Sequence, residues 1–214
     1  MPRSIDTRER IFEISLRLFG DRGYDAVSIR EICREVGIRE SSFYNHYHAK
    51  RVLLERVFAE MGVYLRPPEP PGNRSDFSER LPLAELLERD ITRSLEAWRE
   101  GRLRRLWIVL SQEQYRSREV ADLMAGEQAH RIARTTGLFR ALMASGRMRP
   151  GDADLLAACY VHALTSMRLD YVRGLHHGLD VTTLVRLLHD FAAHFAGQWS
   201  PDCLPDLHEG EAHA

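Results

Sequence analysis

Residues 28–50 read SIREICREVGIRESSFYNHYHAK, and this stretch decides the fold. It opens with Ser28, followed three residues later by Glu31, which is the capping-box pattern that begins a helix. Gly37 supplies the positive φ angle that a tight turn between two helices requires. A second short helix is predicted after this turn, over residues 39–48. Two short helices joined in this way can present the second helix to the major groove of DNA.

The apolar residues of this stretch are spaced to form a small core with the preceding helix. Cys33 is small enough to let the two helices cross closely. The predicted core residues are Leu18, Ile29, Ile32, Val36, Ile38 and Phe43. A plain helical hairpin without a role in DNA binding explains these positions equally well, so the spacing alone leaves both interpretations open.

Helical periodicity extends outward from this stretch through almost the whole chain. One helix is predicted before it, over residues 7–22, between Asp6 and Gly23. Further helices are predicted over residues 50–64, 82–100, 102–115, 117–145, 151–175 and 181–198. The segment RPPEPPGNRSD contains four prolines, which exclude a regular helix there. No β-hairpin pattern is present, so the predicted fold class is all-α.

The composition is that of a globular protein with little net charge. The chain is 44% hydrophobic and 29% charged, with a formal net charge of −1, so bulk charge gives no nucleic-acid signature. Residues 1–60 contain 11 Lys and Arg against 10 Asp and Glu. No apolar run is long enough to cross a bilayer and no secretion signal is visible, which predicts a cytoplasmic protein without membrane association.

The cysteines and histidines give no metal or disulfide pattern. The three cysteines are widely separated, as expected for free thiols in a reducing compartment. The pair His176-His177 lies at a glycine-flanked helix end, where contact with the terminal carbonyls or with solvent is the ordinary role. We predict no metal site, no cofactor and no catalytic residues.

The order of features over residues 7–58 resembles the N-terminal domain of the TetR family of bacterial transcriptional regulators. The matching residues are Phe19, Gly23, Tyr24, Ser28-Ile29-Arg30-Glu31-Ile32, Gly37-Ile38 and Phe43-Tyr44-x-His46-Tyr47-x-x-Lys50. The resemblance implies a three-helix DNA-binding head with a helix-turn-helix, followed by a larger C-terminal helical domain for regulation and dimerisation. Glu40 departs from the family pattern, which often has a lysine there. Its carboxylate can be favoured by the helix dipole, by about 0.3–1 kcal/mol, and can accept from a cytosine amine.

The resemblance also implies roles for single residues in binding operator DNA. Ser28 would direct its hydroxyl and nearby backbone N–H groups toward a phosphate. Tyr44 and Lys50 would hold phosphates on either side of the groove, with help from His46. The remaining polar residues, which would reach base edges or phosphates, are Arg39, Glu40, Ser41, Ser42 and Asn45. Phe43 and Tyr47 are predicted to lie in the core.

The C-terminal half carries two further predictions. An effector pocket is implied by the resemblance, and its candidate lining residues are Trp107, Tyr115, Met124, Gln128 and Tyr171. Ordinary core packing explains each of these residues as well. The last two helices are predicted to form a homodimer through Leu155, Cys159, Ala163, Leu184, Leu188 and Phe191. Closure of the core within one chain is the alternative.

The predicted function is that of a repressor, not an enzyme, which leaves a palindromic operator when a small-molecule effector binds. Two alternatives stay open: a regulator without such an effector, controlled by a protein partner or by abundance, and a helical enzyme or ligand carrier. The predicted domains are a DNA-binding head (1–50), a connecting helix (51–66), a Pro-rich loop (67–78), a ligand-binding and dimerisation domain (79–200) and a tail (201–214).

Overall fold

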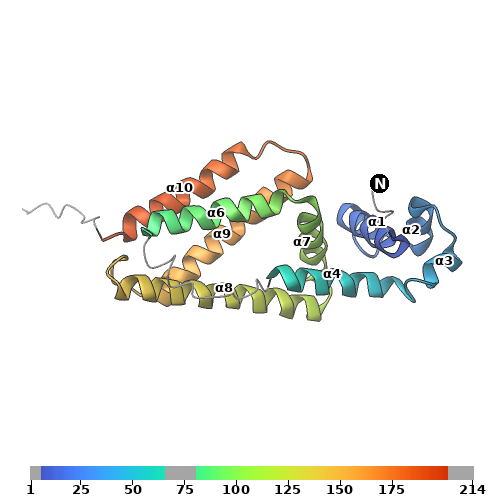
Figure 1. The fold of residues 1–214 in the computed structure, drawn as a ribbon, viewed down its shortest axis with the longest axis horizontal. Helices are drawn as coiled ribbons and strands as arrows, with labels where there is room; N and C mark the ends of the chain where they lie inside the picture. Colours follow the sequence, from blue (N-terminus) through green and yellow to red (C-terminus); the bar gives the residue numbers. More distant parts are fainter. Residues whose placement is uncertain (1–5, 66–80, 202–214) are drawn as a thin grey trace, which may run out of the picture. The chain divides into compact units, whose positions relative to one another are not determined.

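The structure of the protein is a computed structural model that describes residues 6–65 and 81–201. These residues form helices and no strand (Figure 1), which confirms the predicted all-α fold. The helices are α1 (Thr7–Arg22), α2 (Ile29–Val36), α3 (Glu40–Tyr44), α4 (Lys50–Leu65), α6 (Leu83–Arg99), α7 (Gly101–Glu113), α8 (Arg118–Ala144), α9 (Ala153–His176) and α10 (Thr182–Trp199). The predicted Pro-rich loop, and the predicted tail beyond residue 201, lie outside the described residues.

One helix departs clearly from its predicted length. The third helix was expected over residues 39–48 and spans only Glu40–Tyr44. It ends early because the backbone closes into a turn, in which the Phe43 carbonyl accepts the N–H groups of both His46 and Tyr47 at 2.9 Å. Gly23, which ends α1, has a φ of 84° and a ψ of 151°, outside the left-handed helical region.

The chain forms two compact units. Among the described residues, the N-terminal unit comprises residues 6–65 and 98–128, and the C-terminal unit comprises residues 81–97 and 129–201. This division differs from the predicted domain boundaries, because α7 joins the unit that contains the helix-turn-helix. The functions assigned to the predicted domains stay predictions.

The N-terminal unit is built around α1. This helix packs against α2 and α7, and α4 packs against both α7 and α1. Its core consists of apolar side chains that are at most 3% exposed, among them Ile11, Phe12, Leu16, Phe19, Ile32, Val36, Phe43, Leu53, Val57 and Leu106. Full burial of one such side chain contributes about 1.5–3 kcal/mol. This core holds α2 and α3 in place.

The C-terminal unit has an aromatic centre. Tyr160 of α9 lies 5.9 Å from Phe139, 5.6 Å from Phe191 and 4.8 Å from Phe195, measured between ring centroids. Two ion pairs join α6 to the other helices of this unit: Asp90 with Arg168 at 2.9 Å, and Glu88 with His189 at 2.7 Å. The unit is therefore closed by side chains from α6, α8, α9 and α10.

Two kinds of feature are absent from residues 6–65 and 81–201. None of their helices combines the length and the apolar composition needed to cross a membrane. These residues also bring together no cluster of three His, Cys, Asp or Glu side chains suited to a metal ion.

Candidate nucleic-acid interface

The turn between α2 and α3 has the geometry that the sequence predicts. The Oγ atom of Ser28 accepts the backbone N–H of Glu31 at 3.2 Å, and the Glu31 carboxylate accepts the backbone N–H of Ser28 at 2.9 Å. Hydrogen bonds from the backbone and then the hydroxyl of Ser28 lower the pKa of Glu31 to about 2. Gly37 ends α2 in the left-handed conformation, with φ 79° and ψ 36°. The capping box and the glycine turn are therefore confirmed.

α3 is held by two aromatic rings. It has only five residues, and its N-cap residue Arg39 makes no capping bond with its side chain. A helix this short is not stable in water by itself. Phe43 is 0% exposed and Tyr47 is 1% exposed, with ring centroids 5.9 Å apart. The prediction that both residues lie in the core is confirmed, and their packing positions α3.

The outward side of α3 carries polar side chains that are left unbonded. Five of these residues are exposed, namely Arg39, Glu40, Ser41, Tyr44 and Asn45, and two are half-buried, namely Ser42 and His46. We call the whole set the α3 surface: Arg39, Glu40, Ser41, Ser42, Tyr44, Asn45 and His46. Among the residues that the structure describes, none of these side chains has a hydrogen-bond or ion-pair partner. They can therefore bond a ligand without first breaking an internal bond.

Ser28 is already engaged. Its hydroxyl donates to the Glu31 carboxylate at 2.9 Å while it accepts from the Glu31 backbone. The hydroxyl would have to leave the capping box to donate to a phosphate, and its predicted phosphate contact stays a prediction. The backbone N–H groups at the start of α2 are the donors that remain for an anion.

Lys50 is also engaged, at the loop between α1 and α2. Its Nζ donates to the carbonyls of Tyr24 and Val27, at 2.9 Å each, and lies 4.1 Å from the centroid of the Tyr24 ring. Burial lowers the pKa of this ammonium. Two of its three N–H groups are thus used within the chain. Lys50 thus has a structural role, and its predicted phosphate contact, for which one N–H remains, stays a prediction.

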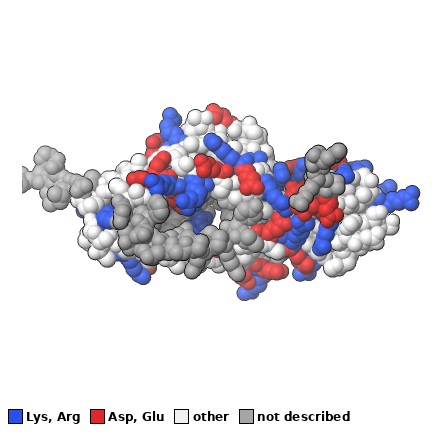
Figure 2. All heavy atoms as spheres, viewed as in Figure 1, with Lys and Arg blue, Asp and Glu red and all other residues white. Residues whose placement is uncertain are grey.

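The two carboxylates of α2 are paired with arginines of α1. Arg17 bonds Glu35 at 2.8 Å, and Arg22 bonds Glu31 at 2.9 Å. On the face in view in Figure 2, acidic and basic side chains are intermingled. This face therefore shows no broad basic surface.

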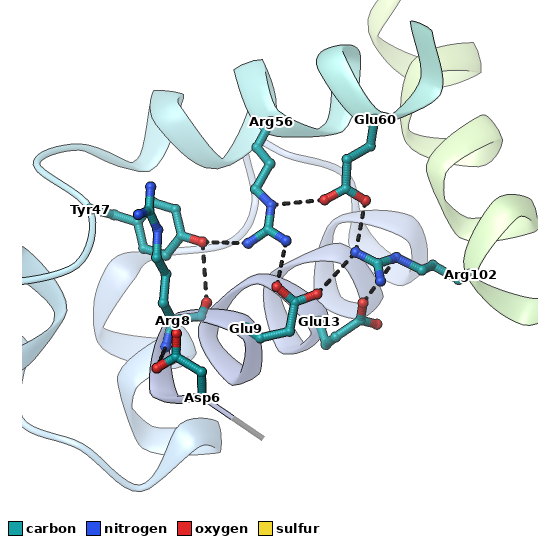
Figure 3. A network of polar contacts seen from close by, with 8 residues as sticks. All are labelled: Asp6, Arg8, Glu9, Glu13, Tyr47, Arg56, Glu60 and Arg102. Carbon is teal, nitrogen blue, oxygen red and sulfur yellow. Dashed lines mark hydrogen bonds and ion pairs between the residues drawn. The ribbon is translucent and has the colours of Figure 1, made fainter. Parts of the chain in front are cut away.

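A closed ring of four charged side chains joins α1, α4 and α7 (Figure 3). Glu9 of α1 bonds Arg56 of α4 and, at 3.0 Å, Arg102 of α7. Glu60 of α4 bonds the same two arginines, Arg56 at 2.8 Å and Arg102 at 2.7 Å. We call these four residues the charge ring. Burial alone would lower the pKa of both guanidinium groups, but the carboxylates around them raise it.

A hydrogen bond connects the charge ring to Tyr47, which follows the end of α3. Arg56 donates to the hydroxyl of Tyr47 at 2.8 Å, and this hydroxyl donates to the carbonyl of Arg8 at 3.1 Å (Figure 3). The ring was not predictable from the sequence because Glu9 and Arg102 are 93 positions apart. The i, i+4 spacing of Arg56 and Glu60 was the one readable signal, and it is common on exposed helix faces.

The predicted effector residues are spread over both units. Trp107 is 8% exposed in the N-terminal unit and Tyr171 is fully buried in the C-terminal unit, while Met124 and Gln128 are half-buried. Tyr115 is 87% exposed because it follows the end of α7, in the turn before α8. Its predicted place in an enclosed pocket is therefore wrong for the single chain.

The residues predicted to form the dimer differ in their exposure to solvent. Leu155 is 60% exposed and Cys159 is exposed, so both are accessible to a partner. The half-buried residues are Ala163, Leu184 and Phe191. Leu188 is 1% exposed, which corrects its assignment, because it already packs in the core of its own chain. Leu187, next to it, is 46% exposed.

Sequence comparison places the similarity in the helix-turn-helix. Residues 11–57 match the model of the family described as bacterial regulatory proteins, tetR family. The HTH-type transcriptional regulator YerO of Bacillus subtilis is 43% identical over 49 residues, which are 23% of this chain and 17% of that protein. The HTH-type transcriptional repressor KstR2 of Mycolicibacterium smegmatis is 30% identical over 53 residues, 25% of this chain and 26% of that protein. The aligned segments thus span about a quarter or less of these relatives.

Solved structures share the fold over most of the chain. The ketosteroid transcriptional regulator KstR2 of Mycobacterium tuberculosis has a TM-score of 0.66 at 18% identity, covering 92% of this chain and 97% of its own. A transcriptional regulator from Saccharomonospora viridis in complex with choline has a TM-score of 0.61 at 23% identity, covering 87% and 95%.

The relatives matched by sequence are named as transcriptional regulators. The family match covers the residues that form the helix-turn-helix in the structure. The likeness of fold extends from there over the described helices. Residues 11–57 are therefore similar to the tetR family of bacterial regulatory proteins, and the described helices share their fold with a solved transcriptional regulator.

Proposed function

We propose that this protein regulates transcription by placing α3 in the major groove of an operator. The observation that carries the proposal is the α3 surface: polar side chains with no bonding partner among the described residues, on a helix fixed from behind by Phe43 and Tyr47. Elsewhere in the N-terminal unit, charged side chains are mostly paired. Polar side chains that make no internal hydrogen bonds can instead bond to base edges.

The α3 side chains differ in the contacts that they can make. Arg39 can bond the two acceptors of a guanine, and Asn45 can bond an adenine. Tyr44, which is 52% exposed, can donate its hydroxyl to a phosphate. Glu40 can accept from a cytosine amine, and it would repel a phosphate.

A homodimer would supply the second half of the interface. Five exposed residues of α9 follow one another at steps of four and three: Leu155, Cys159, His162, Ser166 and Leu169. This is the spacing by which a helix pairs with another helix. Leu187 adds an exposed apolar side chain on α10, which packs against α9. A two-fold dimer would set two α3 helices about 34 Å apart, as a palindromic operator requires.

The regulatory part of the proposal is release of the operator by a small molecule. The similar protein from Saccharomonospora viridis is in complex with choline, and the similar protein of Mycolicibacterium smegmatis is named a repressor. Both support an effector-controlled repressor for this chain, acting in the cytoplasm. The effector would change operator affinity through a coupling free energy of about 1–3 kcal/mol.

The test compares two arginines that carry the same charge and differ in place. The full-length protein is first used to select duplexes from a random-sequence library. Binding of the selected duplex is then measured for Arg39→Ala and for Arg99→Ala, which removes an exposed arginine at the end of α6. We expect Arg39→Ala to weaken binding by about 5- to 150-fold, and Arg99→Ala to leave it unchanged. Equal affinities of the two variants, or no selected duplex at all, would contradict the proposed function.

A further inference from the structure

Arg102 lies in α7, outside the helix-turn-helix. It bonds Glu9 of α1 and Glu60 of α4. Resting on the function proposed above, we propose that Arg102 is a positioning residue for α3: by tying α1 to α4, it sets the orientation in which the α3 surface meets DNA. No DNA contact of Arg102 itself is involved. The effect is transmitted by the charge ring and by Tyr47.

Arg102 closes the charge ring. Without it, Glu9 and Glu60 would each keep a bond to Arg56 only, and the link between α7 and both other helices would be lost from the ring. Its Nη2 lies 3.0 Å from Glu9 and 2.7 Å from Glu60, and its Nε lies 3.2 Å from Glu13. One guanidinium thus bonds three carboxylates on two helices, and its removal increases the repulsion between them.

The surroundings of the ring make this geometry effective. The side chains of the four members are between 24% and 33% exposed, so solvent screens their charges only in part. Beneath them lies the fully buried ring of Phe12, whose centroid is 3.9 Å from Cζ of Arg56 and 5.7 Å from Cζ of Arg102. The aromatic face supports both arginines and limits where they can go.

The contacts continue from the charge ring to α3 (Figure 3). Arg56 donates to the Tyr47 hydroxyl at 2.8 Å, and the Tyr47 ring packs on Phe43, the buried residue of α3. A displacement of Arg102 therefore has a continuous path of bonded or packed side chains to the recognition helix. A path of contacts becomes a coupling only when its energy is measured, and this can be done by mutation.

α7 offers a matched control in Arg104. This residue is half-buried on the same helix, and its side chain has no hydrogen bond or ion pair with the residues described. Arg102→Met and Arg104→Met each remove one charge and keep an aliphatic side chain. Their affinities for a duplex selected by the wild-type protein are measured by fluorescence anisotropy at several salt concentrations.

We expect Arg102→Met to bind the duplex about tenfold more weakly than Arg104→Met, with the same slope of log affinity against log salt. Equal affinities of the two variants would overturn the proposal. A flatter slope for Arg102→Met would also overturn it, since the slope reports contacts to phosphates. If the wild type selects no duplex, the function proposed above fails instead, which separates the two failures.

Two further variants keep the test decisive. Arg102→Lys retains the charge but replaces the planar fork by a single ammonium, so it should lose affinity in the same direction and less. It carries the test if circular dichroism shows that Arg102→Met is unfolded, and wild-type affinity of Arg102→Lys would then overturn the proposal. Combined with Tyr47→Phe, Arg102→Met should cost less than the sum of the two single losses. Strict additivity would exclude the route through Tyr47.

Discussion

The α3 surface and the charge ring lie in the same compact unit and treat polar side chains in opposite ways. In the charge ring, each carboxylate bonds two arginines and each arginine bonds two carboxylates. On the α3 surface, the polar side chains lack partners among the described residues. The charged groups that hold the helices together are thus paired with one another, whereas the polar groups of the α3 surface remain available to bond a ligand.

The largest expected effect comes from Phe43, which connects the two regions. It is fully buried, and its ring packs on Tyr47, which bonds Arg56. Phe43→Ala should lower the free energy of unfolding by about 3–5 kcal/mol, because it leaves a cavity under α3. Urea unfolding monitored by circular dichroism measures this loss. The neighbouring Tyr44→Ala is the control and should change stability by about 0.5 kcal/mol or less; equal losses would contradict the distinction between core and surface.

Lys50 has two candidate roles: it bonds backbone carbonyls within the chain, and the family resemblance implies that it contacts a phosphate. A substitution can distinguish them. Lys50→Met removes the donor of two backbone carbonyls and should cost about 1–3 kcal/mol of stability. The salt slope of DNA binding should stay unchanged, because this ammonium is bonded within the chain. Arg51→Met, at a neighbouring exposed position, is the matched control. Unchanged stability together with a slope reduced by about 0.9 would return Lys50 to the role of a phosphate contact.

Glu113 of α7 belongs to neither region: it is a buried carboxyl with few polar partners. It is 4% exposed, its Oε1 has no hydrogen-bond partner, and Arg116 lies 3.7 Å away. Burial, and then the charge of Asp25, raise the pKa of this carboxyl above its ordinary value of 4.5. A raised pKa in the folded state means that stability is lost as the pH rises through it, because the ionised form is disfavoured.

Glu113→Gln should therefore stabilise the protein at pH 7, by about 1 kcal/mol. The gain should shrink as the pH falls toward 4.5, where the wild-type carboxyl is protonated. Thermal unfolding at several pH values measures it, with Glu119→Gln at an exposed position of α8 as control. A loss of stability at pH 7 would show instead that the charged carboxylate is held by Arg116.

The fold was predictable because it depends on local signals. Helix ends follow from the Ser28–Glu31 capping box, from Gly37 and from apolar periodicity, and most observed ends lie close to the predicted ones. α3 was predicted too long because its end is set by a turn around the Phe43 carbonyl, which has no residue signature of its own.

The candidate site was predictable only in part. Sequence position indicated which α3 residues face outward, since a short helix next to a glycine turn has one inner side. The engagement of Lys50 was not readable, because the carbonyls that it bonds lie 23 and 26 positions earlier and carry no side-chain identity. The same holds for Leu187 and Leu188, where a small rotation of α10 decides which leucine is buried.

The central claim is that α3 reads the major groove, and methylation interference tests it most directly. A selected duplex is treated with dimethyl sulfate, which methylates guanine N7 in the major groove and adenine N3 in the minor groove, and bound and free fractions are compared. The account predicts that N7 methylation blocks binding at two clusters of guanines about one helical turn apart, one for each α3 of a dimer. Interference by adenine N3 methylation alone, with guanine N7 methylation tolerated throughout, would contradict it.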